Sequence, residues 1–352
     1  MNVTIPAGSQ LLSAIRTTSE SLAAIGLALL VSAVLIFIAG ENPLEAYAAL
    51  INGAFGDGFA WGNTLARTTP LIFTGLAVAF AFRCNLLNIG AEGQLYMGAL
   101  ASVLAGIYIT GLPAVVHIPL AILLGFAAGG IWGGFAGYLR ATRGINEIIS
   151  TIMLNFIAIF FVSYLVHGPI AEPPGFFHQT AQVEPSARLP IMMQKSDLSI
   201  SIILAVLVAI VVAYILWRTP FGLRLRAVGQ SQNTAKFSGI PVKGYVFGAM
   251  GISGGLAGLA GATEIIGSQY RLLDFFSPGY GFDGIAVAFL GRSDPIGVIF
   301  AAFLFAALRV GANQMQRTTG LPTSLVVVIQ GMVILFIMGV VIRHWLQARK
   351  QS

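Results

Sequence analysis

Residues 218–243, RTPFGLRLRAVGQSQNTAKFSGIPVK, separate two hydrophobic runs that are each long enough to cross a membrane. The stretch contains basic residues and no acidic residue, the basic ones being Arg218, Arg224, Arg226, Lys236 and Lys243. Such acid-free basic loops are typical of the cytoplasmic segments of membrane proteins, whose short loops follow the positive-inside rule. The sequence therefore predicts a helical membrane protein in which residues 218–243 form a cytoplasmic loop.

A short helix with recognisable ends is predicted inside this loop. Ser231 can cap the amides two and three residues further on, and we expect Gly229 to break the preceding turn. Lys236 falls in the last turn, where the helix dipole favours a cation, and Gly239 followed by Pro241 ends the helix. Two interpretations stay open at this point: a basic loop that only sets topology, and a docking helix presented to a cytoplasmic partner.

Composition supports the membrane class independently of this loop. The chain is 57% hydrophobic and 9% charged, with a mean hydropathy of +0.85, whereas soluble domains have about 25% charged residues. The net charge of +6 does not indicate nucleic-acid binding, because the basic residues lie between and after apolar runs. The single cysteine, Cys84, excludes an intrachain disulfide, and no residue cluster has metal-ligand spacing, so we expect no cofactor and no metal.

A membrane-spanning helix needs about 20 apolar residues, and this window predicts about ten spans in one transmembrane domain over residues 1–352. The predicted fold class is all-α, a polytopic transmembrane helical bundle. The spans are expected near residues 22–39, 64–82, 96–109, 115–139, 145–166, 198–217, 245–266, 282–290, 295–310 and 323–342. The run 22–39 lacks a small-residue cleavage site and is expected to be retained, whereas 282–290 is too short for a full crossing.

The distribution of charge predicts the orientation of these spans. With the N-terminus inside, most basic residues outside the apolar runs fall on the cytoplasmic side: Arg83, Arg140, Arg143, the loop 218–243, Arg292, Arg343, Arg349 and Lys350. The protein is therefore expected in the cytoplasmic (inner) membrane, with both termini on the cytoplasmic side. The longest polar segment, 168–197, is then an external insert, either an irregular cap over a transport mouth or a flexible connector.

Two hydrophobic segments are interrupted at matching places. The first is NLLNIGAEGQ at 85–94, and the second is GYGFDG at 279–284. Glycine-interrupted segments in corresponding positions predict two pseudo-repeat halves with a binding site near the midplane. Sequence identity between the halves is negligible, so this expectation rests on the pattern.

Polar side chains at membrane depth are costly and mark candidate functional sites. The candidates for a substrate pathway are Asn88, Glu92, Gln94, Asn155, Asp283 and Gln330. Glu92 and Asp283 are the leading candidates, because each lies in a helix break where backbone groups also become available. Interhelical hydrogen bonding alone would equally account for Asn155 and Gln330.

The other charged residues near the spans have simpler expectations. Arg67 is expected to snorkel, Glu264 to reach water near the end of its span, and Glu147 to form an interfacial ion pair with Arg143. The four histidines are scattered and the sequence contains no Walker A motif. The chain is therefore not expected to be an enzyme.

Five runs resemble the membrane permease subunits of bacterial ABC importers for simple sugars, nucleosides and branched-chain amino acids, with the closest match to the nucleoside branch. They are NIGAEGQLYMGA at 88–99, GINEIISTIMLNFIA at 144–158, RAVGQSQNTAKFSGI at 226–240, SGGLAGLAGATE at 253–264 and GFDGIAVAFLGRSDPIG at 281–297. The resemblance implies an importer permease that works with a separate ATP-binding subunit. It also implies a second permease subunit, in a heterodimer, and an extracytoplasmic substrate-binding protein.

The resemblance further implies that residues 226–240 form the coupling helix that docks on the ATPase. The positions that match are Arg226, Gly229, Ser231, Ala235, Lys236, Phe237 and Gly239. The family commonly has Asn-Pro where this chain has Ser231-Gln232. The first turn of the helix therefore lacks the fixed φ angle of proline, but Ser231 can still cap the helix.

The resulting hypothesis is a permease that translocates a nucleoside, or a simple sugar, while a separate subunit hydrolyses ATP. Its expected partners are the three subunits named above, the small-molecule substrate and membrane lipid. No nucleic acid is expected to bind. One alternative is an ion-coupled secondary transporter in which Glu92 and Asp283 carry protons. Another is a membrane-embedded subunit of an energy-converting complex. The basic loop favours the first of the three.

Overall fold

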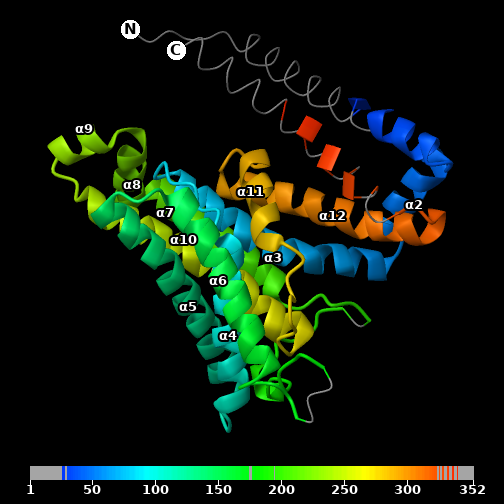
Figure 1. Cartoon of the computed structure of the whole chain (residues 1–352), viewed down its shortest axis with the longest axis horizontal. Coiled ribbons are helices and arrows are strands. Elements are labelled where there is room, and N and C mark those ends of the chain that lie inside the picture. The colour runs from blue at the N-terminus through cyan, green and yellow to red at the C-terminus, as the bar shows by residue number, and fades with distance from the viewer. Residues whose placement is uncertain are drawn as a thin grey trace. The chain divides into compact units, whose positions relative to one another are not determined.

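The computed structural model describes residues 26–27, 30–173, 177–193, 195–322 and single residues between 325 and 339. The chain forms two compact units, residues 1–60 with 307–352 and residues 61–306. Helices make up nearly all of the described parts of both units (Figure 1).

The larger unit, with the two helices that continue into the smaller one, has the predicted long helices in the predicted order. Its helices are α3 (Gly58–Phe82), α4 (Ala91–Tyr108), α5 (Ala114–Arg143), α6 (Glu147–His167), η1 (Pro185–Ala187), α7 (Ser201–Arg218), α8 (Pro220–Gln230), α9 (Gln232–Phe237), α10 (Val242–Glu264), η2 (Ile265–Gln269), α11 (Tyr280–Leu290) and α12 (Pro295–Thr319). Of these, α8, η1 and η2 were not predicted. Within the described ranges the only extended pairing is two isolated bridges, Gln179 with Leu273 and Ile191 with Ser199. The all-α prediction is confirmed.

The predicted number of about ten spans is not confirmed. Six of the described helices are long and apolar enough to cross a membrane: α3, α5, α6, α7, α10 with η2, and α12. A bent pair, Leu30–Ile38 with α2 (Pro43–Phe55), would make a seventh if it counts as one span. The short α11 does not qualify, because its 11 residues extend only about 16 Å. Residues 22–25, 28 and 29 of the first predicted span and most of the last predicted span, 323–342, lie outside the described residues.

Three helices of the larger unit pack at backbone distance, and glycine makes this possible. A Cβ on Gly258 of α10 would lie 2.3 Å from the carbonyl oxygen of Gly125 in α5, and a Cβ on Gly98 of α4 would lie 2.3 Å from the carbonyl oxygen of Gly258. A Cβ on Gly129 would similarly lie 2.4 Å from the Gly254 oxygen. Small residues at helix contacts let backbones approach closely in membranes, so the glycine runs unite α4, α5 and α10.

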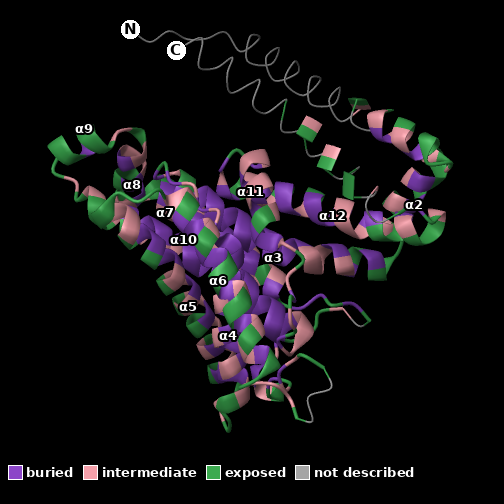
Figure 2. Cartoon of the chain, viewed as in Figure 1, coloured by how far each residue is buried: buried purple, intermediate pink, exposed green. Residues whose placement is uncertain are grey.

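Burial separates central helices from peripheral ones in this unit. The most apolar windows of α3 and α10 are 78% buried, whereas those of α5, α6 and α7 are 22 to 33% buried. Figure 2 shows the same contrast, with buried residues concentrated in α3, α4 and α10. The exposed faces of α5, α6 and α7 are rich in large apolar side chains, as expected of helix surfaces in a membrane protein.

The smaller unit has its own hydrophobic cluster. Its buried members are Ile36, Ala46, Ala49, Ala312, Met315 and Leu321. Helix α2 begins where Asn42 accepts a hydrogen bond from the Leu44 amide at 3.0 Å, and Pro43 occupies the first position, where no amide is needed. Close approach of α12 to α2 requires Gly311, whose added Cβ would meet the Leu50 oxygen at 2.3 Å.

The segment predicted as an external insert, residues 168–197, is tied to the rest of the protein by hydrogen bonds and an ion pair where the structure describes it. Its backbone amides at Thr180, Val183 and Leu189 donate to carbonyl oxygens in η2 and in the segment that follows, at 2.8 to 3.0 Å. Arg271 adds an ion pair to Glu172 at 3.4 Å. The insert therefore packs as an ordered layer on the segment between α10 and α11.

The glycine contacts between α4, α5 and α10 should tolerate no extra methyl group. Gly258→Ala is expected to lower the thermal unfolding midpoint of the detergent-purified protein, because overpacking costs about 1–3 kcal/mol. Gly248→Ala in the same helix is the control, since nothing lies within 4 Å of the position its Cβ would take. Equal unfolding midpoints for the two variants would show that the close approach is not a constraint on folding.

Candidate functional site

The interruption before α4 is held by reciprocal amide contacts. Asn88 is fully buried; its Nδ2 donates to the Gln94 Oε1 at 2.8 Å, and Gln94 Nε2 donates back to the Asn88 Oδ1 at 3.1 Å. Asn88 Nδ2 also donates to the Ser253 hydroxyl at 2.7 Å, and Ser253 donates to the Ala77 carbonyl oxygen at 2.6 Å. Two predicted pathway residues thus connect the interruption to α3 and α10.

Asn155 of α6 completes this arrangement from the other side. Its Oδ1 accepts a hydrogen bond from the Gly93 amide at 2.7 Å, and its Nδ2 donates to the Ile89 carbonyl oxygen at 2.8 Å. The first amides of a helix have no partner within the helix, so an interruption at membrane depth needs side chains that pair with them. Asn155 therefore has the hydrogen-bonding role that the sequence left as one of two interpretations.

Glu92 joins the two interrupted segments to each other. Its carboxylate is 2% exposed, and Oε2 accepts a hydrogen bond from the Gly281 amide at 2.6 Å. A Cβ on Gly281 would lie 2.2 Å from the Glu92 nitrogen, so the first turns of α4 and α11 touch at their backbones. A carboxylate at this point is favourable, because both helix dipoles present their positive ends to it.

The start of α11 brings the second interruption to the same place. Gly279 has a φ of +96°, a conformation that suits glycine, and it turns the chain into α11. Asp283 lies half-buried in the first turn of α11, and Gly284 packs against Thr74 of α3. The two segments predicted as counterparts are thus neighbours in space. Gln330 lies outside the described residues.

A second polar cluster was not foreseen from the sequence. Arg67 of α3 forms an ion pair with Glu264 of α10 at 3.2 Å, and the same nitrogen donates to the Tyr280 hydroxyl at 2.8 Å. Gln269 Nε2 also donates to Glu264 at 3.1 Å. The expectation that Glu264 reaches water was wrong, because its side chain is only 5% exposed and pairs with Arg67. The Arg67 side chain remains 37% exposed, so its predicted snorkelling is not contradicted.

The acid–base pair predicted at the start of α6 forms with a different partner. Glu147 pairs with Arg140 at 3.2 Å rather than with Arg143, which is exposed. Arg140 lies one helical turn before Arg143 on α5, and the Asn146 cap sets where α6 begins.

The predicted docking helix is present as α9. Ser231 is its N-cap and accepts a hydrogen bond from the Thr234 amide at 3.2 Å. Lys236 lies in the last turn, and Gly239, with a φ of +76°, follows the helix. Ala235 is buried, whereas the Phe237 side chain is 93% exposed. Helix α9 therefore packs against the protein through Ala235 and exposes Lys236 and Phe237.

The predicted role of Gly229 as a turn breaker was wrong. Gly229 lies inside α8, where an added Cβ would lie 2.3 Å from the Arg83 carbonyl oxygen. Glycine is required there for close packing of α8 on the chain after α3, not for a turn. Arg226 also faces the protein, with its guanidinium carbon 4.6 Å from the centre of the Trp217 ring.

Cys84 belongs to the same contact. Its side chain is fully buried, and burial raises the pKa of the thiol to about 12. A thiol in that state is a poor nucleophile at neutral pH, so cysteines introduced elsewhere can be labelled in the presence of Cys84.

The Glu92 contact should depend on an acceptor oxygen more than on charge. Glu92→Gln is expected to fold with little loss, because its amide oxygen can accept the Gly281 hydrogen bond. Glu92→Leu leaves that buried amide without its acceptor and should cost about 1–3 kcal/mol in thermal unfolding. Glu184→Leu, at an exposed glutamate, is the control. Equal loss in the glutamine and leucine variants would contradict the acceptor role.

Substitution of Gly229 should loosen α8 locally. Gly229→Val is expected to accelerate amide hydrogen exchange in residues 220–237 while α4, α5 and α10 retain their protection, because the valine side chain collides with the Arg83 carbonyl. Gly244→Val is the control, with nothing within 4 Å of its Cβ. Unchanged exchange in α8 and α9 would exclude the packing role.

Comparison with known proteins identifies the family. A family model described as "Branched-chain amino acid transport system / permease component" matches residues 61–338. The chain is 40% identical to the guanosine ABC transporter permease protein NupP of Bacillus subtilis, with 90% of this chain and 91% of the relative covered. It is 34% identical to the glucose ABC transporter permease protein TsgB13 of Haloferax volcanii, covering 88% and 84%. The guanosine permease protein NupQ of Bacillus subtilis is 31% identical, covering 69% and 78%. The chain, a multi-pass membrane protein, belongs to the permease components of the branched-chain amino acid transport system family.

Proposed function

We propose that the chain is the permease subunit of an ABC importer and passes a nucleoside, or a simple sugar, across the cytoplasmic membrane. The observation that carries the proposal is the outward-facing α9, in which the capped helix presents Lys236 and Phe237 beside a loop without acidic residues. An exposed aromatic ring next to cations suits a protein partner whose pocket takes the ring. The nucleoside substrate follows from the similarity to the guanosine permease proteins.

The partners follow from the same similarity. A separate ATPase would bind α9 and hydrolyse ATP, so that the permease itself is not an enzyme. A substrate-binding protein would meet the external insert, where Phe177 is 72% exposed. Two different guanosine permease proteins of one bacterium resemble this chain, which supports a heterodimer with a second permease. Both termini would then lie in the cytoplasm, as the charge distribution indicates.

The substrate route would pass beside the two helix interruptions. Asn88, Glu92, Gln94 and Asn155 use their polar atoms on one another and on the backbone of α4 and α11, so their role is to hold the walls of the route in place. Asp283 is half-buried at the start of α11, which makes it the stronger candidate for direct contact with substrate. Gln330 stays a proposal from the sequence.

The alternative of ion coupling has no support among the three relatives described above, which are all named as ABC transporter permease proteins. The geometry does not favour it either. Glu92 accepts a hydrogen bond from the Gly281 amide where two helix N-termini meet, so its carboxylate already has a structural role.

The proposed function predicts guanosine uptake that follows ATP. Membrane vesicles with the chain, its second permease, the ATPase and the binding protein should accumulate guanosine only when ATP is supplied, with or without an uncoupler. Phe237→Ala should lower both the co-purified ATPase and the uptake by about tenfold, as expected for an aromatic anchor worth about 1.4 kcal/mol or more.

Tyr108→Ala is the matched control for co-purification, because Tyr108 is also exposed and lies at the opposite end of α4 from the interruption. Uptake that needs a proton gradient, ignores ATP and disappears in both Glu92→Gln and Asp283→Asn would establish ion coupling instead.

A further inference from the structure

At the end of α7, Trp217 is surrounded by side chains from three other segments. The guanidinium carbons of Arg83 and Arg226 lie 4.9 Å and 4.6 Å from the centre of its ring. Its indole nitrogen donates to the Asp294 carboxylate at 3.2 Å. We call Arg83, Trp217, Arg226 and Asp294 the Trp217 cluster. It joins the chain after α3, the end of α7, α8 and the start of α12.

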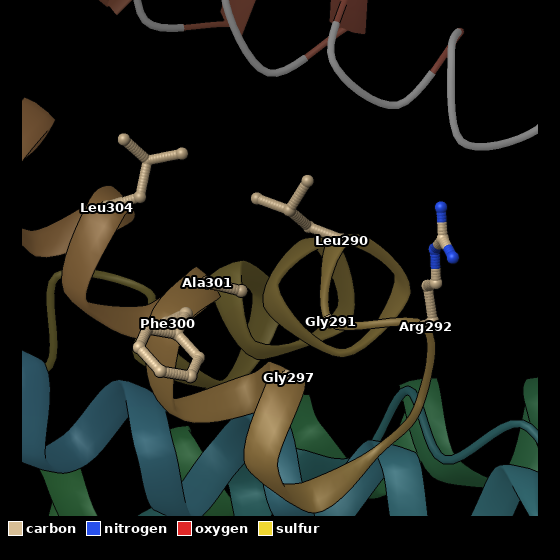
Figure 3. Close-up of a pocket in the computed structure, with 7 residues that line it drawn as sticks. All are labelled: Leu290, Gly291, Arg292, Gly297, Phe300, Ala301 and Leu304. Atoms are coloured by element: carbon tan, nitrogen blue, oxygen red, sulfur yellow. The ribbon is translucent and has the colours of Figure 1, made fainter. Parts of the chain in front are cut away.

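The turn between α11 and α12 is strained where it meets this cluster. Arg292 and Ser293 have φ values of +56° and +51°, which are costly for residues with a side chain. A Cβ on Gly297 would lie 2.3 Å from the Gly291 oxygen, so the two helix ends approach closely there. Figure 3 shows Gly291 and Arg292 at the end of α11 and Gly297 in α12 beside them.

Two members of the cluster hold this turn from both ends. Arg83 donates from Nε at 3.0 Å and from Nη2 at 2.7 Å to the carbonyl oxygen of Ser293. Asp294 accepts hydrogen bonds from the amides of Ile296 and Gly297 at 3.0 Å and 3.3 Å, which caps α12, while its other oxygen accepts from Trp217. A strained turn persists when its surroundings determine it in this way.

The cluster also lies directly against α8, which leads into α9. Gly229 of α8 touches the Arg83 backbone, and Arg226 of α8 lies over Trp217. A shift of α8 must therefore move Arg83 or break its contacts with Ser293. On the far side, α11 runs as one uninterrupted helix from this turn back to Gly281, whose amide binds Glu92. Packed side chains and rigid helices of this kind can carry coupling between distant sites.

We propose that the Trp217 cluster transmits movement of α8 and α9 to α11 and thereby to the paired helix interruptions, with Arg83 as the positioning residue. The inference rests on the proposed function, since α9 moves only if it docks on an ATPase. Arginine is required at 83 because two of its nitrogens reach the Ser293 carbonyl while its guanidinium carbon lies over the indole. Lysine retains the charge but offers neither geometry.

The test separates docking from transmission in the reconstituted importer described above. Arg83→Gln is expected to retain the ATPase and its hydrolysis in the presence of guanosine-loaded binding protein. Guanosine transported per ATP hydrolysed should fall by about fivefold or more, at the lower end of coupling effects between sites. Arg83→Lys should fall nearly as far. The control Arg143→Gln removes the same charge from the end of α5, where Arg143 is exposed, and should leave the ratio unchanged.

An unchanged ratio in Arg83→Gln overturns the inference, and so does a parallel loss of hydrolysis and transport, which a merely structural role would produce. If Arg83→Gln does not accumulate, Trp217→Phe decides, because it retains a ring under the guanidinium groups and loses only the hydrogen bond to Asp294. A lower ratio in Trp217→Phe supports the inference and an unchanged one overturns it. Failure of the wild-type chain to bind any ATPase would instead disprove the proposed function.

Discussion

The hydrogen bond from the Gly281 amide to Glu92 is the contact on which the arrangement of the larger unit depends. Helix interruptions at membrane depth leave backbone amides without partners, and hydrocarbon supplies none. Two such N-termini meet here, and a single carboxylate lies at their common positive end. The side chains of Asn88 and Asn155 form hydrogen bonds with further backbone groups of the first interruption. The polar residues at membrane depth are thus first of all the partners of an irregular backbone.

This contact is possible only because glycine allows helices to approach closely. Gly281 lets the backbone of α11 reach that of α4, and Gly98 and Gly258 do the same for α4 and α10. Larger side chains at these positions would move the helices apart and separate the carboxylate from the amide. The buried hydrogen bonds therefore depend on close helix packing, because donor and acceptor reach hydrogen-bonding distance only where glycine lets the backbones approach.

Helices α8 and α9 show a different division of roles. Phe237 and Lys236 point outward, whereas Gly229 and Arg226 contact the protein itself. One short stretch therefore contains both the exposed surface that we propose for the ATPase and the contacts that attach this surface to the rest of the protein. The structure separates the exposed residues of α8 and α9 from the packed ones, whereas the basic, acid-free sequence does not show which residues are exposed.

The sequence by itself determined the membrane class, the helix order and the ends of α9, because these follow from hydrophobic length, charge pattern and local capping. It also singled out Asn88, Glu92, Gln94 and Asn155, since polar residues in apolar surroundings are conspicuous. Only the tertiary structure decided what each of them contacts. The pairing of Arg67 with Glu264, the packing of Gly229 on Arg83 and the meeting of the two interruptions join residues from 146 to 197 positions apart. Periodicity and capping act within a few turns of helix, whereas such contacts depend on how whole helices pack, and no local pattern encodes that.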